Sequence, residues 1–258
     1  MTTRRSLTTP RRLAAFVAVA VIGAGGLAAC SDDDGESGSE EITGPTIPDE
    51  VTQILDASAT AMAEVESVSF DLVRSGAPVY LDQVESISVD SVVGQVVVDE
   101  AAAAVLGVQV DGALNTELGA IAVGDEVLLT NPITGLYEPL PTGIDIDPSL
   151  FFDPDDGWSP LLAGLTDATS LGIEERREAD RYHVSGVATA EQIEIITAGL
   201  VRNQDLPIDF WIHPVTGLVT DAEFTATFDG EDVSWTLELD EYGRDFEIAV
   251  PDELRGDA

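Results

Sequence analysis

Between residues 67 and 140 the sequence consists of short, valine-rich segments separated by turn-forming residues. The segments are SVSFDLVRS, ESISVDSVVGQVVVD, AAAAVLGVQVDGAL, ELGAIAVGDEVLLTN and GLYEPL, and Gly-Asp, Asp-Gly or Asn-Pro pairs interrupt them. β-branched residues favour strands, and such pairs favour tight turns. Because strands joined by tight turns pair in antiparallel fashion, this stretch predicts an antiparallel meander.

The middle of this meander does not alternate cleanly between apolar and polar residues. The segment GQVVVDEAAAAVLGVQV, residues 94–110, carries apolar residues on both faces of the predicted sheet. A sheet with one face in water alternates more regularly. Two interpretations follow: both faces are partly covered, or one face lines an apolar cavity. In the second, the small residues Gly94 and Ala101–Ala104 would leave room for a ligand.

Strand patterns return after residue 170. LGIEERREA, DRYHVSGVA, PIDFWIHP, GLVTDAEFTATFDG, EDVSWTLELDEYG and DFEIAVP are predicted strands, and HPVTGL and FDGED predict hairpin turns. In VSWTLEL, the apolar residues Val233, Trp235, Leu237 and Leu239 fall on one face. This second group of strands is therefore expected to bury one face against a core.

Three segments have helical periodicity. Residues 48–65 begin with Pro-Asp-Glu, which suits a helix N-terminus, and repeat apolar residues at steps of three and four. Residues 144–170 predict two short helices or one broken helix, with Trp158, Leu161, Leu162 and Leu165 on one face. Residues 189–201 predict a helix that Thr189 caps.

The N-terminus has the order of a secretory signal peptide. Four arginines are followed by the uncharged run 13–29 and by Cys30, the single cysteine of the chain. Leu27-Ala28-Ala29-Cys30 matches the lipobox of bacterial lipoproteins, which implies that Cys30 is lipidated after cleavage before it. An uncleaved signal anchor is the alternative, although 17 residues rich in Ala and Gly are marginal as a membrane span.

These features predict three regions. Residues 1–29 are a lipoprotein signal peptide, residues 30–47 are a lipidated N-terminus with a flexible acidic tether, and residues 48–258 are a single domain. The expected location is the cell membrane, where the lipid on Cys30 anchors a body that faces the extracytoplasmic space.

The charge of the chain excludes nucleic acid as a partner. The full chain carries −38, and its first 29 residues contribute four arginines and no acid, so the remainder carries −42. Phosphate binding needs a cationic face, and this chain contains no lysine. Solubility or adaptation to a salty medium explains the acidity better than recognition of a specific partner.

The sequence offers few groups for catalysis. A nucleophile needs a neighbouring base, but the chain has two histidines, His183 and His213, and lacks a Gly-x-Ser-x-Gly motif. Both histidines are expected at the surface or at a sheet edge. DPDDG, residues 153–157, lacks the 12-residue spacing of a calcium loop, so a turn or cap is favoured over a weak calcium site. We expect no enzyme activity, no cofactor and no metal.

Residues 144–251 resemble the LppX/LprAFG lipoproteins of mycobacteria and their relatives. The shared features are Asp-Pro-x-x-Gly before a Leu-Leu-x-x-Leu helix, a Tyr-x-Val-Ser-Gly strand, a Trp-Ile-x-x-x-Thr-Gly-Leu hairpin and a final Leu-x-x-Tyr-Gly. They occur here as DPDDGWSPLLAGL, RYHVSGVA, FWIHPVTGL and LDEYG. The lipobox, the tether and the first helix agree with this resemblance.

The resemblance implies an α+β fold in which helices cover the concave face of a strongly curved antiparallel half-barrel. An apolar cavity between them would bind an acylated lipid or glycolipid and carry it across the envelope, without catalysis. The acidity disfavours anionic lipoglycans more than neutral acyl chains. The residues predicted to line the cavity are Ile54, Met62, Phe151, Phe152, Trp158, Leu161, Leu162 and Leu165.

The alternative function is a non-catalytic envelope scaffold with a solid core that works beside a membrane transporter. Under this alternative the same apolar residues would fill the core and leave no cavity. A transporter is the further partner considered in both cases.

Overall fold

The computed structural model describes residues 46–82, 84–124, 126–140, 152, 156–197, 199–250 and 254. These residues belong to one compact unit, Ile42–Ala258. Cys30, the predicted signal peptide and nearly all of the predicted tether lie outside the described residues. Within the described part of the chain, no helix is long and apolar enough to cross a bilayer.

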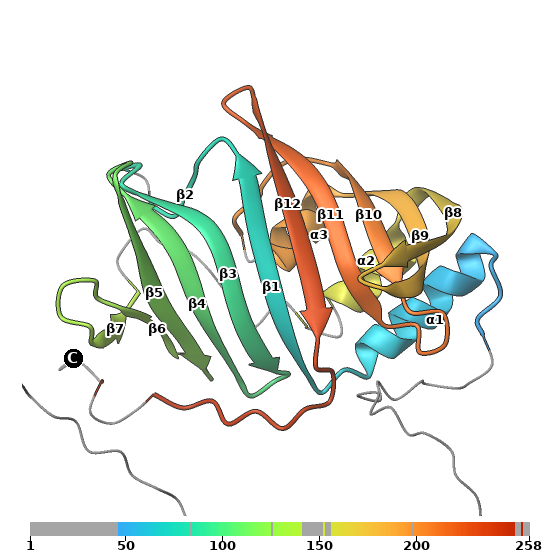
Figure 1. Cartoon of the computed structure of the whole chain (residues 1–258), viewed down its shortest axis with the longest axis horizontal. Coiled ribbons are helices and arrows are strands. Elements are labelled where there is room, and N and C mark those ends of the chain that lie inside the picture. Colours follow the sequence, from blue (N-terminus) through green and yellow to red (C-terminus); the bar gives the residue numbers. More distant parts are fainter. Residues whose placement is uncertain are drawn as a thin grey trace, which may run out of the picture. The chain divides into compact units, whose positions relative to one another are not determined.

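Twelve strands form one mostly antiparallel sheet that curves but does not close (Figure 1). The spatial order is β7-β6-β5-β4-β3-β1-β12-β11-β10-β9-β8, and β2 pairs with β3. The strands are β1 (Ser67–Gly76), β2 (Val79–Tyr80), β3 (Ile87–Val97), β4 (Ala101–Val110), β5 (Leu114–Val123), β6 (Glu126–Thr130), β7 (Tyr137–Pro139), β8 (Thr166–Arg176), β9 (Ala179–Ala188), β10 (Leu206–Ile212), β11 (Val219–Phe228) and β12 (Glu231–Asp240).

The sheet joins two consecutive groups of strands. The first group contains β1 to β7 and the second contains β8 to β12, and β1 pairs with β12 at the middle of the sheet. Leu72 faces Leu237 in this pair, and Phe70 faces Leu239. The predicted antiparallel sheet and its α+β class are thereby confirmed.

Three helices lie on the concave side of the sheet among the described residues: α1 (Val51–Ala63), α2 (Trp158–Gly164) and α3 (Ala190–Ile196). α1 corresponds to the helix predicted for residues 48–65, and α2 packs against both α1 and α3. Thr189 caps α3 through a capping box, in which its side chain accepts from Gln192 N and the Gln192 side chain accepts from Thr189 N. The predicted cap is therefore confirmed, although α3 ends five residues earlier than residue 201.

Two predicted elements are wrong. The helix expected to continue through residue 170 ends at Gly164, and β8 begins at Thr166 and pairs with β9. The predicted strand DFEIAVP has no strand structure between Asp245 and Val250. This segment keeps an alternating burial pattern, but it runs across the lower ends of β1, β3 and β4 instead of along a sheet edge, so it has no ladder to join (Figure 1).

The solid part of the core lies between the helices and the strands β9 to β12. Trp158 of α2 packs edge-on against Phe210 of β10, with ring centroids 6.1 Å apart, and stacks on Phe152 at 6.2 Å. Phe224 and Trp235 stack at 6.3 Å on neighbouring strands. Burial of these large rings supplies much of the hydrophobic stabilisation of this half of the sheet.

The outer face of the other half carries exposed valines. Val93, Val105 and Val123 are 51%, 46% and 43% exposed on β3, β4 and β5. Apolar residues occur on both faces of this region because one face lines a cavity, whereas the other is open to solvent. Of the two interpretations of the imperfect alternation, the structure supports the cavity.

Candidate ligand-binding cavity

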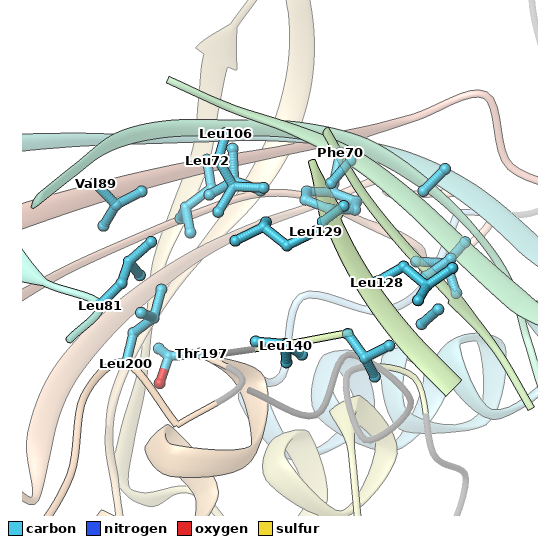
Figure 2. Close-up of a pocket in the computed structure, with 18 residues that line it drawn as sticks. Phe70, Leu72, Leu81, Val89, Leu106, Leu128, Leu129, Leu140, Thr197 and Leu200 are labelled. Carbon is cyan, nitrogen blue, oxygen red and sulfur yellow. The ribbon is translucent and has the colours of Figure 1, made fainter. Parts of the chain in front are cut away.

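An apolar cavity of about 110 Å³ lies under the half of the sheet that contains β1 and β3 to β6. Figure 2 shows the strands arching above it, with Leu140 and Thr197 on the opposite side. The lining residues that the structure describes are Phe70, Leu72, Leu81, Val89, Val92, Val96, Ala102, Ala103, Ala104, Leu106, Ala120, Ala122, Val127, Leu128, Leu129, Leu140, Thr197 and Leu200.

Strand alternation creates this lining. On β4, Ala102, Ala104 and Leu106 point to the concave face, and Ala120 and Ala122 do so on β5. Alanine at consecutive inward positions of neighbouring strands removes the side-chain volume that would otherwise fill the space. Ala102, Ala103 and Ala104 contribute to the lining, whereas Ala101, which the sequence interpretation also named, does not.

Gly94 creates space in a different way. A Cβ atom at this position would lie 2.7 Å from Cζ of Phe70 and 2.6 Å from the Ala103 carbonyl oxygen. The missing side chain thus accommodates the Phe70 ring, which itself lines the cavity.

The chemistry of the lining is almost purely hydrophobic. Among the described lining residues, Thr197 alone has a polar side chain, and its Oγ1 donates to the Ile193 carbonyl oxygen at 2.7 Å. Oγ1 also accepts from the amide of Val201 at 3.1 Å. Because helix and loop backbone already occupy this hydroxyl, the lining can attract a ligand through apolar contact but provides no anchor for a polar group.

The volume of the cavity limits what it holds without movement. It is smaller than an engineered apolar cavity of about 150 Å³ that stays dry and binds benzene. A long acyl chain would need the lining residues to separate further. At the volume described, the cavity accommodates a short apolar segment.

The residues predicted to line the cavity lie in the solid core instead. Six of them are buried in the main hydrophobic cluster, Leu165 is half-buried and packs against it, and Phe151 lies outside the described residues. The six are Ile54, Met62, Phe152, Trp158, Leu161 and Leu162. None of them lines the 110 Å³ cavity, and their contact with a ligand stays a prediction.

His183 lies on the outer face of the sheet. Its ring stacks on Trp211 at 4.6 Å, and its nitrogens lie 2.9 Å from Glu174 and 3.1 Å from Asp209. The guanidinium carbon Cζ of Arg176 lies over the Trp211 ring, 4.1 Å from its centroid. The imidazole is thus a member of a polar surface network that contains carboxylates and an arginine.

His213 stabilises the turn between β10 and β11. Its Nδ1 accepts hydrogen bonds from the amides of Val215 at 3.2 Å and Thr216 at 3.1 Å. Burial and, to a smaller degree, the charge of Arg181 lower the pKa of His213. A neutral ring is needed for Nδ1 to accept, so the lowered pKa agrees with a structural role.

The DPDDG segment lies mostly outside the described residues, since 153–155 are not described. In the parts of the chain that the structure describes, no cluster of three His, Cys, Asp or Glu side chains could hold a metal ion.

The model of the LppX_LprAFG lipoprotein family matches residues 50–248. The chain belongs to this family. The match includes every strand and helix described above, including the meander β1 to β7, which lies outside residues 144–251.

Two solved structures have the same fold. LprF from Mycobacterium bovis is 17% identical, with 81% of this chain and 100% of LprF covered and a TM-score of 0.57. LppX from Mycobacterium tuberculosis is 14% identical, with 77% of this chain and 98% of LppX covered and a TM-score of 0.53. No curated protein sequence matches the chain.

Proposed function

We propose that this family member binds an acylated lipid or glycolipid in the cavity under β1 and β3 to β6 and carries it between the membrane and the outer envelope. The observation that carries this proposal is the cavity lining, which combines inward alanines with leucine and valine and leaves no polar side chain free. Each methylene that moves from water into such a lining gains roughly 0.8 kcal/mol. An acyl chain can therefore be held without polar contacts.

The N-terminal sequence supports an anchored carrier. In the proposal, residues 1–29 are removed, Cys30 carries the lipid anchor, residues 30–47 form the tether and residues 48–258 form the carrier body. The body faces the extracytoplasmic space, and a membrane transporter is a further partner. The protein performs no catalysis in this proposal.

A second candidate is the non-catalytic scaffold with an effectively solid core. The small volume of the cavity favours it, because 110 Å³ holds no complete acyl chain without rearrangement. The two candidates differ in whether the protein carries lipid.

Native mass spectrometry of detergent-free protein from its own host separates them. The carrier predicts an added mass that organic extraction removes and that yields an acyl-containing lipid. Ala122→Phe, which fills the cavity, is expected to lose that mass, whereas Val123→Phe on the outer face of the same strand keeps it. Protein without bound lipid that cannot be loaded with one would refute the carrier and support the scaffold.

A further inference from the structure

One end of the concave face carries an apolar rim beside the cavity. The amide of Leu81 donates to the carbonyl of Ile87 at 2.8 Å, Ile87 pairs with Val110, and Val110 pairs with Leu114. These residues therefore form a row across the ends of β2 to β5. We use "apolar rim" for Ile87, Val110, Leu114 and the nearby Val84.

Exposure rises along this row. Leu81 lines the cavity and is 9% exposed, Ile87 and Val110 are half-buried, and Leu114 is 62% exposed. Val84, in the loop between β2 and β3, is 80% exposed. The row thus leads from the cavity lining to open solvent through apolar side chains that pair across neighbouring strands.

The rim and the cavity share one face of the sheet. Ile87 lies two residues before the lining residue Val89, and Val110 lies four residues after the lining residue Leu106. Leu114 lies six residues before the lining residue Ala120. Even spacing along a strand keeps side chains on the same face, so Ile87, Val110 and Leu114 continue the cavity surface.

The loop that displays Val84 is held in place. The Asp82 carboxylate accepts from the Ser86 amide and the Ile87 amide, each at 2.9 Å, and from Ser86 Oγ at 2.5 Å. The next loop is tied to it, because the Asp111 amide donates to the Ser86 carbonyl oxygen at 2.8 Å. Val84 and Leu114 are therefore presented on two linked turns, and binding through them requires little further ordering.

The charges beside the apolar rim determine which kind of surface can bind it. Residues 77–116 contain no lysine, arginine or histidine, while Asp82, Glu85 and Asp111 flank the rim. The adjacent Arg74 guanidinium is engaged with the carbonyls of Val89 and Ala77 and with Asp90. These carboxylates would repel an anionic surface, and they would repel the same carboxylates of a second copy. They would not repel an uncharged apolar surface.

We propose that the apolar rim docks on a bilayer whose headgroups carry no net charge, with Val84 and Leu114 inserted at its surface. The proposal rests on the proposed carrier function, because docking brings the cavity end to the lipid that is loaded or delivered. Side chains that are exposed in water gain free energy when they enter the apolar boundary of a bilayer.

The predicted tether allows this geometry. The chain enters the described body at Ile47, whose amide donates to the Pro214 carbonyl at 2.8 Å and whose carbonyl accepts from Tyr182 Oη. β9 and β5 belong to opposite halves of the sheet order, so the entry point lies away from the rim. A flexible tether of this length spans roughly 20 Å on average. A body anchored in one membrane can thus present the rim to another.

The test uses the protein purified from its host's membranes and reconstituted into donor vesicles. Binding to protein-free acceptor vesicles of phosphatidylcholine is measured by vesicle–vesicle energy transfer. The double variant Val84→Asp/Leu114→Asp is expected to lower acceptor binding at least about tenfold. Burial of one Val or Leu side chain contributes a free energy that corresponds to roughly a tenfold change in affinity. The matched control is Leu171→Asp, because Leu171 is 57% exposed on β8 at the far edge of the sheet. Thermal unfolding verifies that each variant is folded.

Four results would overturn the proposal. Three concern vesicles: unchanged binding by the double variant, an equal loss in Leu171→Asp, and stronger binding when phosphatidylglycerol is added to the acceptors. The fourth is rim-dependent dimerisation on size exclusion without vesicle binding, which would assign the rim to a second copy. Lipid analysis of the same samples distinguishes the carrier proposal from the docking proposal. If the protein docks through the rim but holds no lipid, the carrier proposal alone is refuted. If the protein holds lipid but does not dock through the rim, the docking proposal alone is refuted.

Discussion

The ring of Phe70 occupies the space that a side chain at position 94 would fill on the neighbouring strand. A Cβ on Gly94 would approach Phe70 Cζ to 2.7 Å and the Ala103 carbonyl oxygen to 2.6 Å. Because Phe70 lines the cavity, the absence of a side chain at residue 94 determines where the wall of the cavity lies.

Gly94→Ala is therefore expected to destabilise the fold by about 1–3 kcal/mol, as is typical of overpacking. Denaturant unfolding measures the change. Gly186→Ala on β9 is the matched control, because its Cβ would approach the Thr166 carbonyl oxygen to 3.3 Å. This milder approach needs a smaller shift than the one at Gly94, so Gly186→Ala should destabilise the fold less. Equal free energies of unfolding for the two variants would contradict the role of Gly94.

Tyr242 connects the end of β12 to the core. Its Oη donates to the Val219 carbonyl oxygen at 2.5 Å and lies 3.7 Å from Sδ of Met62 on α1. Burial, reinforced by the charge of Asp240, raises the pKa of Tyr242 well above its usual range, so the hydroxyl stays protonated and donates. Tyr242→Phe should lower the free energy of unfolding by about 1 kcal/mol. Tyr80→Phe, at an exposed tyrosine, should leave it unchanged.

Asp221 is fully buried between two arginines. Its Oδ1 lies 3.3 Å from Nε of Arg176 and 3.3 Å from Nε of Arg177, next to the turn between β8 and β9. Asp221→Ala removes the one buried carboxylate of this cluster and leaves the two arginines with partly exposed carboxylates as partners, so it should cost about 1.5–3 kcal/mol. Glu223→Ala removes a carboxylate that also contacts Arg176 but is 40% exposed, and should cost less than about 1 kcal/mol. A thermal unfolding comparison in which both variants cost the same would refute this assignment.

The pH dependence of stability reports on the Asp82 turn. Burial opposes ionisation of Asp82, but hydrogen bonds from Ser86 Oγ and the amides of Ile87 and Ser86 outweigh it, so its pKa is lowered from 3.8. Ionised Asp82 therefore stabilises the fold above its unfolded-state pKa, and this contribution is lost as the pH falls through the folded-state pKa. Asp82→Ala should be less stable than the parent near neutral pH, and the difference should shrink well below pH 3.8. Glu117→Ala, at an exposed position, should show no such difference at either pH.

The sequence predicted the fold well where local chemistry determines structure. Periodicity located α1, and Thr189 marked the start of α3. The predicted strand 245–251 failed because alternation reports which residues are covered, whereas a strand also needs a neighbouring ladder. The sequence predicts that the helix of residues 144–170 continues past Gly164, because Leu165 keeps the apolar spacing. In the structure, Thr166 already pairs with Val187 of β9.

The sequence predicted an apolar cavity, but the helix residues named for its lining pack in the core cluster. Helical spacing identified Leu161 and Trp158 as buried, and the structure places both in the core cluster. Periodicity cannot distinguish a side chain that packs against another from one that faces a void, because both are hidden from water. The signal that did locate the cavity was the run of inward alanines on β4, which is visible in the sequence but has meaning only beside Ala120 and Ala122 on β5.

The most direct test of the carrier is to map where a bound acyl chain lies. The protein is loaded with a phosphatidylcholine that carries a photoreactive group within one acyl chain, irradiated and digested, and the labelled peptides are identified by mass spectrometry. The carrier predicts adducts on cavity residues such as Leu106 and Leu129, which Ala122→Phe abolishes. Labelling confined to outer-face residues such as Val93 and Val105, or unaffected by Ala122→Phe, would contradict it.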